Sequence, residues 1–370
     1  MNRYGLLRNR CSQHVPTLCI VVLFFVLFTS CHKSGPTEPQ PGPDTTSHEF
    51  IWDRPALLGE GAGGLSDVTI VNDTLAYAAG GAYKLDSTGI LDPKAYNLFK
   101  WDGKTWSLNR LQFYSICGQS NMSPFLTTSV ISFGPSDTWF AAGNQIVRWN
   151  GSSQSAPVCL PTTYGLIKMW AASSNLIYAV GGGGTILRYD GNTWQSLYSG
   201  TTLDIRDIWG ALDPVTGKWQ VLAVASGNSP AEGKKILAID GTTVAALPDS
   251  GLSWILRGIY FVVRQAYYVA GDGLAHRRDF DNTPWNVYPP GTVASYQDGG
   301  VRGNGVNDVF VVGSFMECVH YNGSTWHNYK DQISFANGAL VSICVKGNLV
   351  IAVGLIGQQG VAVVGRRRTD

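Results

Sequence analysis

Charged residues are scarce in this chain: Asp, Glu, Lys and Arg make up 14% of its 370 residues, against about 25% in ordinary soluble domains. The two signs also balance, with 27 basic and 26 acidic side chains. No net positive field is therefore available to hold a polyanion, and we exclude nucleic acid as the main partner. What the chain has in plenty is glycine, at 44 residues, and 42 aromatic residues (12 Trp, 16 Tyr and 14 Phe), a composition that favours strands and tight turns.

The usual catalytic motifs are also missing. No serine has the G-x-S-x-G context of a nucleophile elbow. Residues 59–64 (GEGAGG) satisfy G-x-G-x-x-G, but they precede a predicted strand and open no helix. His276, His320 and His327 lack the i, i+4 spacing of a helical zinc pair. We therefore expect no cofactor and no metal site, and the sequence supports no catalytic residue.

The first 31 residues predict an export signal. Three arginines and no acid precede an apolar run at 18–28, which at eleven residues is about half the ~20 that span a bilayer. Leu27-Phe28-Thr29-Ser30-Cys31 resembles the lipobox of bacterial lipoproteins. The resemblance implies a signal peptide at 1–30 and lipidation of Cys31, a palmitate-type anchor that would be the chain's only contact with a membrane. Ordinary secretion, with cleavage near Ser30 and an unmodified cysteine, is the alternative.

The anchor would place the protein in the bacterial cell envelope. His32 and Lys33 follow the cysteine, where inner-membrane lipoproteins carry an aspartate, so the resemblance favours the outer membrane. Residues 31–48 contain four prolines and no large apolar side chain, which predicts a disordered tether. At the other end, residues 366–370 (RRRTD) read as a basic, solvated tail.

Between these ends one motif recurs. FKWDGKTWSL at 99–108, LRYDGNTWQSL at 187–197 and VHYNGSTWHNY at 319–329 each alternate apolar and polar residues, reach Asp-Gly or Asn-Gly, and resume with Thr-Trp. An Asx-Gly pair favours the positive φ of a hairpin turn, so each fragment predicts two antiparallel strands. A second pair of strands is predicted upstream of each, such as LIYAVG at 176–181.

The repeat spacing predicts the architecture. The turn positions recur every 40 to 50 residues; they are Gly103, Gly151, Gly191, Gly241, Asn282, Gly323 and Gly365. Four strands per unit at this period indicate a β-propeller. We therefore predict an all-β, seven-bladed β-propeller with four-stranded antiparallel blades, forming one domain over residues 49–365.

The chain ends supply a test of ring closure. The last unit lacks a Thr-Trp strand, while residues 50–54 (FIWDR) form a strand with no partner in the first unit. Pairing the two would close the ring and remove a frayed terminal blade. We predict that Trp52 takes the place that Trp326 holds in the preceding blade.

The blades resemble those of bacterial repeat propellers of the kelch, WD-repeat and photosystem-assembly-factor types. The resemblance implies a non-catalytic scaffold that binds an unidentified protein or glycan, and we expect a monomer. The alternative is a carbohydrate-active enzyme, such as a sialidase-like hydrolase, with its site at the mouth of the central channel. Such an enzyme would need converging arginines, and three arginines near the starts of innermost strands could form an anion site at the channel mouth: Arg206, Arg257 and Arg302. Local pairing, for example with Asp207 or Asp298, is the competing interpretation.

Loop length predicts the binding face. Connections between second and third strands, and between blades, emerge on one face of a propeller, and there the segments 81–97, 107–127 and 152–166 are long. We place a partner on their aromatic side chains, although the same side chains could instead pack the loops onto the disc; they are Tyr83, Tyr96, Tyr114, Phe125 and Tyr164.

Cysteines add one constraint. Cys117 and Cys159 lie in connections on the same face of neighbouring blades, so we predict a disulfide between them. Cys318 and Cys344 occupy strand positions in the last two blades and are interpreted as buried free thiols.

Overall fold

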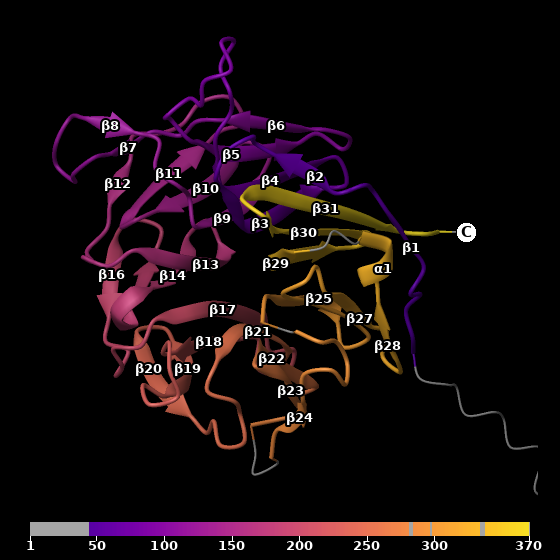
Figure 1. Cartoon of the computed structure of the whole chain (residues 1–370). Helices are drawn as coiled ribbons and strands as arrows, with labels where there is room; N and C mark the ends of the chain where they lie inside the picture. The colour runs from indigo at the N-terminus through magenta and orange to yellow at the C-terminus, as the bar shows by residue number, and fades with distance from the viewer. Residues whose placement is uncertain (1–43, 281–283, 297, 334–336, 370) are drawn as a thin grey trace, which may run out of the picture. The chain divides into compact units, whose positions relative to one another are not determined.

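The computed structural model describes residues 44–280, 284–296, 298–333 and 337–369. The proposed signal peptide, Cys31 and the Asn282 turn lie outside the described residues. Within the described ranges the strands form eight antiparallel sheets: seven blades arranged around one axis (Figure 1), and a separate two-stranded sheet of Phe113–Tyr114 and Met122–Ser123. The chain is therefore a seven-bladed β-propeller.

Each of the first six blades has four strands, numbered from the channel outward. Blade 1 contains β3 (Gly64–Asn72), β4 (Leu75–Ala82), β5 (Tyr96–Trp101) and β6 (Trp106–Asn109). Blade 2 contains β9 (Ser129–Gly134), β10 (Asp137–Ala142), β11 (Gln145–Trp149) and β12 (Val158–Cys159). Blade 3 contains β13 (Leu166–Ser173), β14 (Leu176–Gly181), β15 (Ile186–Tyr189) and β16 (Trp194–Leu197).

Blades 4 to 6 repeat the pattern after a 3₁₀ turn at Gly182–Gly184 in blade 3. Blade 4 contains β17 (Ile205–Leu212), β18 (Trp219–Ser226), β19 (Lys234–Asp240) and β20 (Thr243–Leu247). Blade 5 contains β21 (Leu256–Val262), β22 (Ala266–Gly271), β23 (Gly273–Arg277) and β24 (Asn286–Tyr288). Blade 6 contains β25 (Val301–Gly305), β26 (Asp308–Val312), β27 (Cys318–Tyr321) and β28 (Trp326–Asn328). A short helix, α1 (Lys330–Ile333), leads to blade 7.

Blade 7 is built from both ends of the described chain. β29 (Gly338–Lys346), β30 (Leu349–Ile356) and β31 (Gln359–Arg367) come from the C-terminal side, and β1 (Phe50–Trp52) and β2 (Ala56–Leu58) both pair with β31. Figure 1 shows indigo β1 beside yellow β31. The predicted closure is confirmed.

The register confirms the predicted place of the closing tryptophan. Trp326 lies opposite Tyr321 in blade 6, and Trp52 lies opposite Gly365 in blade 7. Tyr321 and Gly365 themselves face equivalent residues of the second strands, Val309 and Val350. Gly365 is thus a strand residue, and its interpretation as a turn glycine is wrong by two positions.

Turn chemistry explains the hairpins. Asp102 accepts hydrogen bonds from the backbone N–H groups of Lys104 (3.0 Å) and Thr105 (2.8 Å). Gly103, which follows Asp102 in the turn, has a φ angle of +96°, a backbone conformation that residues other than glycine rarely adopt. Asp190 and Asn322 make the same bonds in blades 3 and 6. The Asx-Gly pairs are therefore structural.

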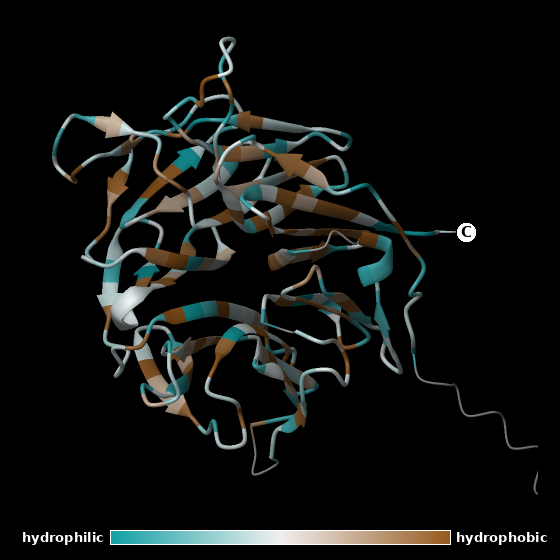
Figure 2. Cartoon of the chain, viewed as in Figure 1, coloured by the Kyte–Doolittle hydropathy of each residue, from teal (hydrophilic) through white to brown (hydrophobic). Residues whose placement is uncertain are grey.

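Apolar side chains fill the spaces between blades. Tyr77 and Leu98 of blade 1 are buried against Phe140 and Val147 of blade 2, and the other boundaries repeat this arrangement. Figure 2 shows the hydrophobic colour running along strands such as β13 and β31. The core is thus a ring of inter-blade clusters around a channel. No helix in the part of the chain that the structure describes is long and apolar enough to cross a membrane.

The ordered disc is larger at both ends than the sequence predicts. Residues 44–48, expected in the tether, lie along blade 6, where the Thr46 N–H donates to the carbonyl oxygen of Asn322 at 3.1 Å. Arg366 and Arg367, expected in the tail, belong to β31 and pair with Asp53 and Asp308. The pairing of β1 with β31 explains both extensions, because it brings the two chain ends to the same sheet edge.

Candidate functional site: the channel mouth and the loop-rich face

A belt of buried charge crosses the middle of the channel. The Asp67 carboxylate on β3 is fully buried and accepts hydrogen bonds from Lys168 Nζ, Ser129 Oγ (2.7 Å) and Ser342 Oγ (2.9 Å). Burial alone would raise the pKa of Asp67, but Lys168 and these hydrogen bonds hold it below its ordinary value. The belt joins blades 1, 2, 3 and 7.

A second ion pair completes the belt. Arg302 on β25 donates from NH1 and NH2 to the two carboxylate oxygens of Asp207 on β17, at 2.8 and 2.7 Å. Both side chains are at most 10% exposed. The neighbouring Asp207 carboxylate offsets the cost of burying the guanidinium, and the Arg302 pKa is accordingly raised. Arg302 is therefore committed to the fold, and the predicted three-arginine anion site loses this member.

The other two arginines remain at the mouth. Arg206 and Arg257 occupy equivalent positions at β-bulges near the starts of β17 and β21. With Arg302 they line one cavity of about 390 Å³, where four cationic side chains face the carboxylates of Asp207 and Asp298. This cavity opens toward the face that carries the long loops, because the innermost strands begin there.

Donors at this mouth are unsatisfied. Arg206 pairs with Asp204 (3.2 Å) and bonds Asn228 (2.9 Å), but its buried Nε has no acceptor. The Arg257 guanidinium makes no hydrogen bond or ion pair with any described residue. The nearby Asp298 carboxylate instead accepts hydrogen bonds from the N–H group and the hydroxyl of Ser314. Burial and the adjacent Arg206 lower the pKa of Arg257 from its ordinary value, although an arginine stays protonated at physiological pH. A half-buried cation with free donors is suited to binding an anionic group.

The predicted aromatic residues divide into two groups. Tyr83, Tyr96 and Tyr114 are half-buried and hold loops in place; the Arg110 guanidinium lies 4.0 Å from the centre of the Tyr96 ring. Phe125 is 43% exposed and Tyr164 54% exposed. The Tyr164 ring lies against Gly183, where a Cβ atom would come within 2.5 Å of it. Packing thus explains three of the five aromatics, and two remain available to a partner.

Sequence reasoning missed the aliphatic part of this face. Ile90, in the loop between β4 and β5, is 67% exposed, and Ile116, near the hairpin of β7 (Phe113–Tyr114) and β8 (Met122–Ser123), is 60% exposed. Further exposed apolar side chains lie in the same connections: Leu85, Leu91, Met122 and Leu126. Their place in the longest loops was the available signal, but aromatic residues alone were selected. These exposed apolar side chains all lie in connections on the same face of the disc, which makes that face a candidate interaction surface.

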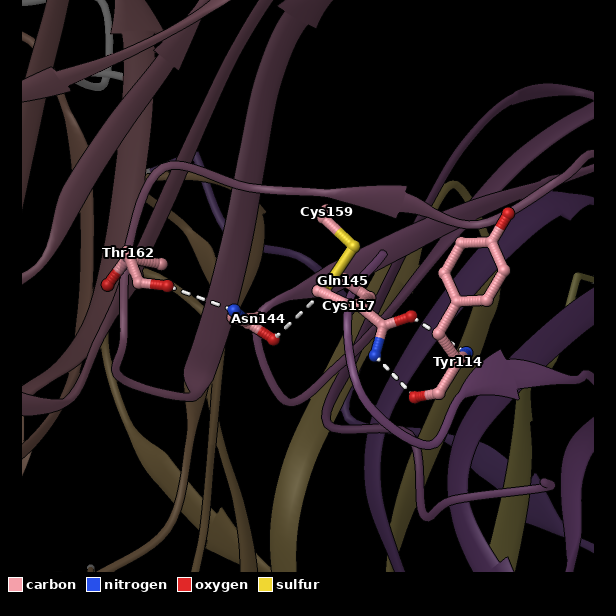
Figure 3. Close-up of a disulfide and its surroundings, with 6 residues drawn as sticks. All are labelled: Tyr114, Cys117, Asn144, Gln145, Cys159 and Thr162. Atoms are coloured by element: carbon pink, nitrogen blue, oxygen red, sulfur yellow. Dashed lines mark hydrogen bonds between the residues drawn. A yellow bond between two sulfur atoms is a disulfide. The ribbon is translucent and has the colours of Figure 1, made fainter. Parts of the chain in front are cut away.

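A disulfide fixes part of the face. Cys117 and Cys159 are joined, with 5.9 Å between their Cα atoms. Beside it, Gln145 accepts a hydrogen bond from the Tyr114 N–H and donates one to the Tyr114 carbonyl oxygen, both at 2.9 Å (Figure 3). These bonds attach the β7–β8 hairpin to blade 2. Cys318 is a buried free thiol, and Cys344 is free and partly buried.

The channel has a second, less polar half. A cavity of about 380 Å³ lies below the belt, lined by Phe133, Trp170, Trp209 and aliphatic side chains. In the described ranges, no three His, Cys, Asp or Glu side chains are placed to hold a metal ion.

Comparison with known proteins identifies the fold. No protein-family model and no curated protein matches the sequence. Among solved structures, the chain is similar to YCF48 bound to D1 peptide, with 17% identity, a TM-score of 0.60, and coverage of 89% of this chain and 100% of that one. It is also similar to the WD40 propeller domain of Doa1, with 11% identity, a TM-score of 0.60, and coverage of 86% of this chain and 98% of that one. The WD40 repeats of RRP9 are similar as well, with 10% identity, a TM-score of 0.61, and coverage of 86% of this chain and 100% of that one. At these identities the likeness extends to the β-propeller architecture.

Proposed function

We propose that this protein is a non-catalytic scaffold that binds another protein through its loop-rich face. The observation that carries the proposal is Arg257, which pairs with no residue that the structure describes and lies beside Arg206 at the centre of a face whose loops expose Ile90, Ile116 and Tyr164. A cationic centre surrounded by apolar contacts fits a segment that carries a carboxylate among apolar side chains.

Two further observations support a protein partner. The apolar side chains of this face are mostly aliphatic and come from several loops, a composition suited to protein surfaces. One propeller of similar fold, YCF48, was solved bound to a D1 peptide. In addition, the ion pairs that span the channel connect the inner strands of several blades, so the loops extend from a cross-linked platform.

Site-specific photo-crosslinking in cells tests this function. A photo-reactive amino acid at Ile116 should yield a discrete crosslinked protein, whereas the same group at Val215, exposed on the opposite face, should not. Arg257→Glu should abolish the Ile116 product, because it places a carboxylate where the partner's anionic group would bind. Lys104→Glu, in a turn on the opposite face, is the matched charge control and should leave it unchanged. Identical products from Ile116 and Val215 would contradict the proposal.

We also propose that Cys31 carries a lipid anchor that holds the disc in the bacterial cell envelope, with the outer membrane favoured. The support is the resemblance of residues 27–31 to a lipobox and the proline-rich segment that follows. Metabolic labelling with an alkyne fatty acid should mark the wild-type protein and not Cys31→Ser. Equal labelling of both would refute the anchor and leave the proposed binding face unaffected.

A further inference from the structure

Three of the four histidines in the described ranges meet where residues 44–49, hereafter the strap, cross blade 6. His48 Nδ1 lies 2.8 Å from His320 Nδ1, and His320 Nε2 lies 2.9 Å from Asp308 Oδ1. His48 Nε2 is 3.0 Å from Thr325 Oγ1, and the His327 ring is 5.4 Å from the His48 ring. His320, which pairs in β27 with His327 of β28, is fully buried.

The network has one consistent direction. Asp308 also accepts hydrogen bonds from Arg367 and Asn304, and its pKa is lowered, so it is an ionised acceptor. His320 must then donate from Nε2, which leaves its Nδ1 as an acceptor. His48 donates to it from Nδ1 and accepts from the Thr325 hydroxyl at Nε2. These tautomers are assigned from the hydrogen-bond pattern. They require His320 Nδ1 to be unprotonated, whereas the Thr325 hydroxyl beside His48 Nε2 can donate or accept.

The same place holds the strap by its backbone. The Tyr329 hydroxyl donates to the His48 carbonyl oxygen at 2.7 Å, and Arg367 donates to that of Ser47 at 2.8 Å. The side chain of Asn307 donates to the Asp44 carbonyl oxygen at 3.0 Å. Apart from its histidine the strap buries little, because Asp44, Ser47 and Glu49 are exposed. Beside these hydrogen bonds, the histidine network is therefore the main buried side-chain attachment of the strap.

We propose that the strap is an acid-released latch: protonation of His48 and His320 detaches residues 44–49 from blade 6 while the propeller stays folded. A proton on His320 Nδ1 would set two N–H groups against each other across 2.8 Å. A proton on either ring also adds a second positive charge near Arg367, and among the described residues the Asp308 carboxylate is the anion that faces the pair.

The remaining groups around the pair do not offset that charge. His327 would add to it, and Tyr329 stays neutral because burial raises its pKa. The buried thiol of Cys318, next to Tyr329, is likewise neutral. Glu49 is paired with Arg368 at 3.6 Å and is exposed. Detachment would free the six residues of the strap from the disc.

The sign and range of the effect follow from the His48 titration. Burial, His320, His327 and Arg367 lower the pKa of His48 from 6.5 to about 4. The attached strap thus has full stability above pH 6.5 and loses it as the pH falls toward 4. For this one group, linkage gives an opening equilibrium about twentyfold larger at pH 5 than at pH 7.

Hydrogen exchange of the full-length protein, corrected for the intrinsic pH dependence, measures this opening. The amides of Thr46 and its neighbours in the strap should become about twentyfold less protected between pH 7 and pH 5, while β30 keeps its protection. His48→Gln retains a donor for His320 but does not titrate, so most of the change should disappear.

His276→Gln is the matched control, because His276 is also half-buried with a lowered pKa but lies in blade 5. That variant should keep the wild-type response. Three results would each overturn the latch: equal strap protection at both pH values, an unchanged response in His48→Gln, or loss of β30 protection in step with the strap.

Discussion

Asp67 lies at the centre of the disc with no exposure to solvent, yet its surroundings keep it ionised. Lys168 supplies the opposite charge, and the hydroxyls of Ser129 and Ser342 and the N–H groups of Val68 and Val130 supply further donors. An isolated buried charge is very costly, but one that is fully hydrogen-bonded is tolerated. Asp67 therefore links inner strands that share no backbone hydrogen bonds.

Replacing this carboxylate should be strongly destabilising. Asp67→Ala leaves the mostly buried Lys168 without this counter-charge, so we expect a loss of about 3–5 kcal/mol in the free energy of unfolding. Asp53→Asn, in the exposed pair with Arg366, is the control and should change it by less than about 1 kcal/mol. Urea unfolding followed by tryptophan fluorescence measures both, and equal effects would show that the belt does not support the fold.

The sequence predicted some of these residues and not others. Arg206 and Arg257 could be assigned to the mouth because they share one position of a repeated strand. The partners of Asp67 and Arg302 could not, because Lys168 and Asp207 are 101 and 95 residues away and follow no repeat. The burial of His320 could not be predicted either, because His48 and Phe50, which cover it, come from the other end of the chain. A local sequence pattern therefore predicts which strand position a residue occupies, but the side chain that it contacts across the ring can be identified only from the folded structure.

Strand pairs were predictable wherever the turn chemistry was local. Asx-Gly with a following threonine identifies a hairpin from four consecutive residues, and the register in blades 1, 3 and 6 agrees with it. Gly365 was misassigned because blade 7 has no such turn: its outer strand comes from the other end of the chain. A glycine is used there because a Cβ atom would come within 2.6 Å of the Trp52 ring.

The disulfide between Cys117 and Cys159 closes a loop across 42 residues, from the β7–β8 hairpin to β12. Breaking it should destabilise the protein by about 2–4 kcal/mol, chiefly because the unfolded chain gains freedom. We expect Cys117→Ser/Cys159→Ser to unfold at lower denaturant concentration than the oxidised wild type. Adding a reductant should lower the denaturant midpoint of the wild type and leave that of the double variant unchanged. Coincident curves for oxidised and reduced wild type would contradict this.

At the scale of the whole disc, stability depends on a closed ring. Every blade buries its faces only against its two neighbours, as the inter-blade clusters show. A repeat array that stays open leaves two apolar faces exposed, whereas closure buries both. Blade 7 carries this role, since its inner strands come from one end of the chain and β1 and β2 from the other.

Removal of the closing strands should therefore weaken the disc far beyond their size. A chain that begins at residue 59 lacks β1 and β2, so β31 loses its outer partners and Phe50 no longer covers Phe310 and Tyr329. We expect its melting temperature to fall by at least about 5 °C, measured by calorimetry. A chain beginning at residue 44 keeps every described contact and should melt like the full-length protein. Adding a peptide of residues 44–58 should restore much of the loss, because it can pair with β31. If the shorter chain melts unchanged, closure by the N-terminal strands does not stabilise the ring.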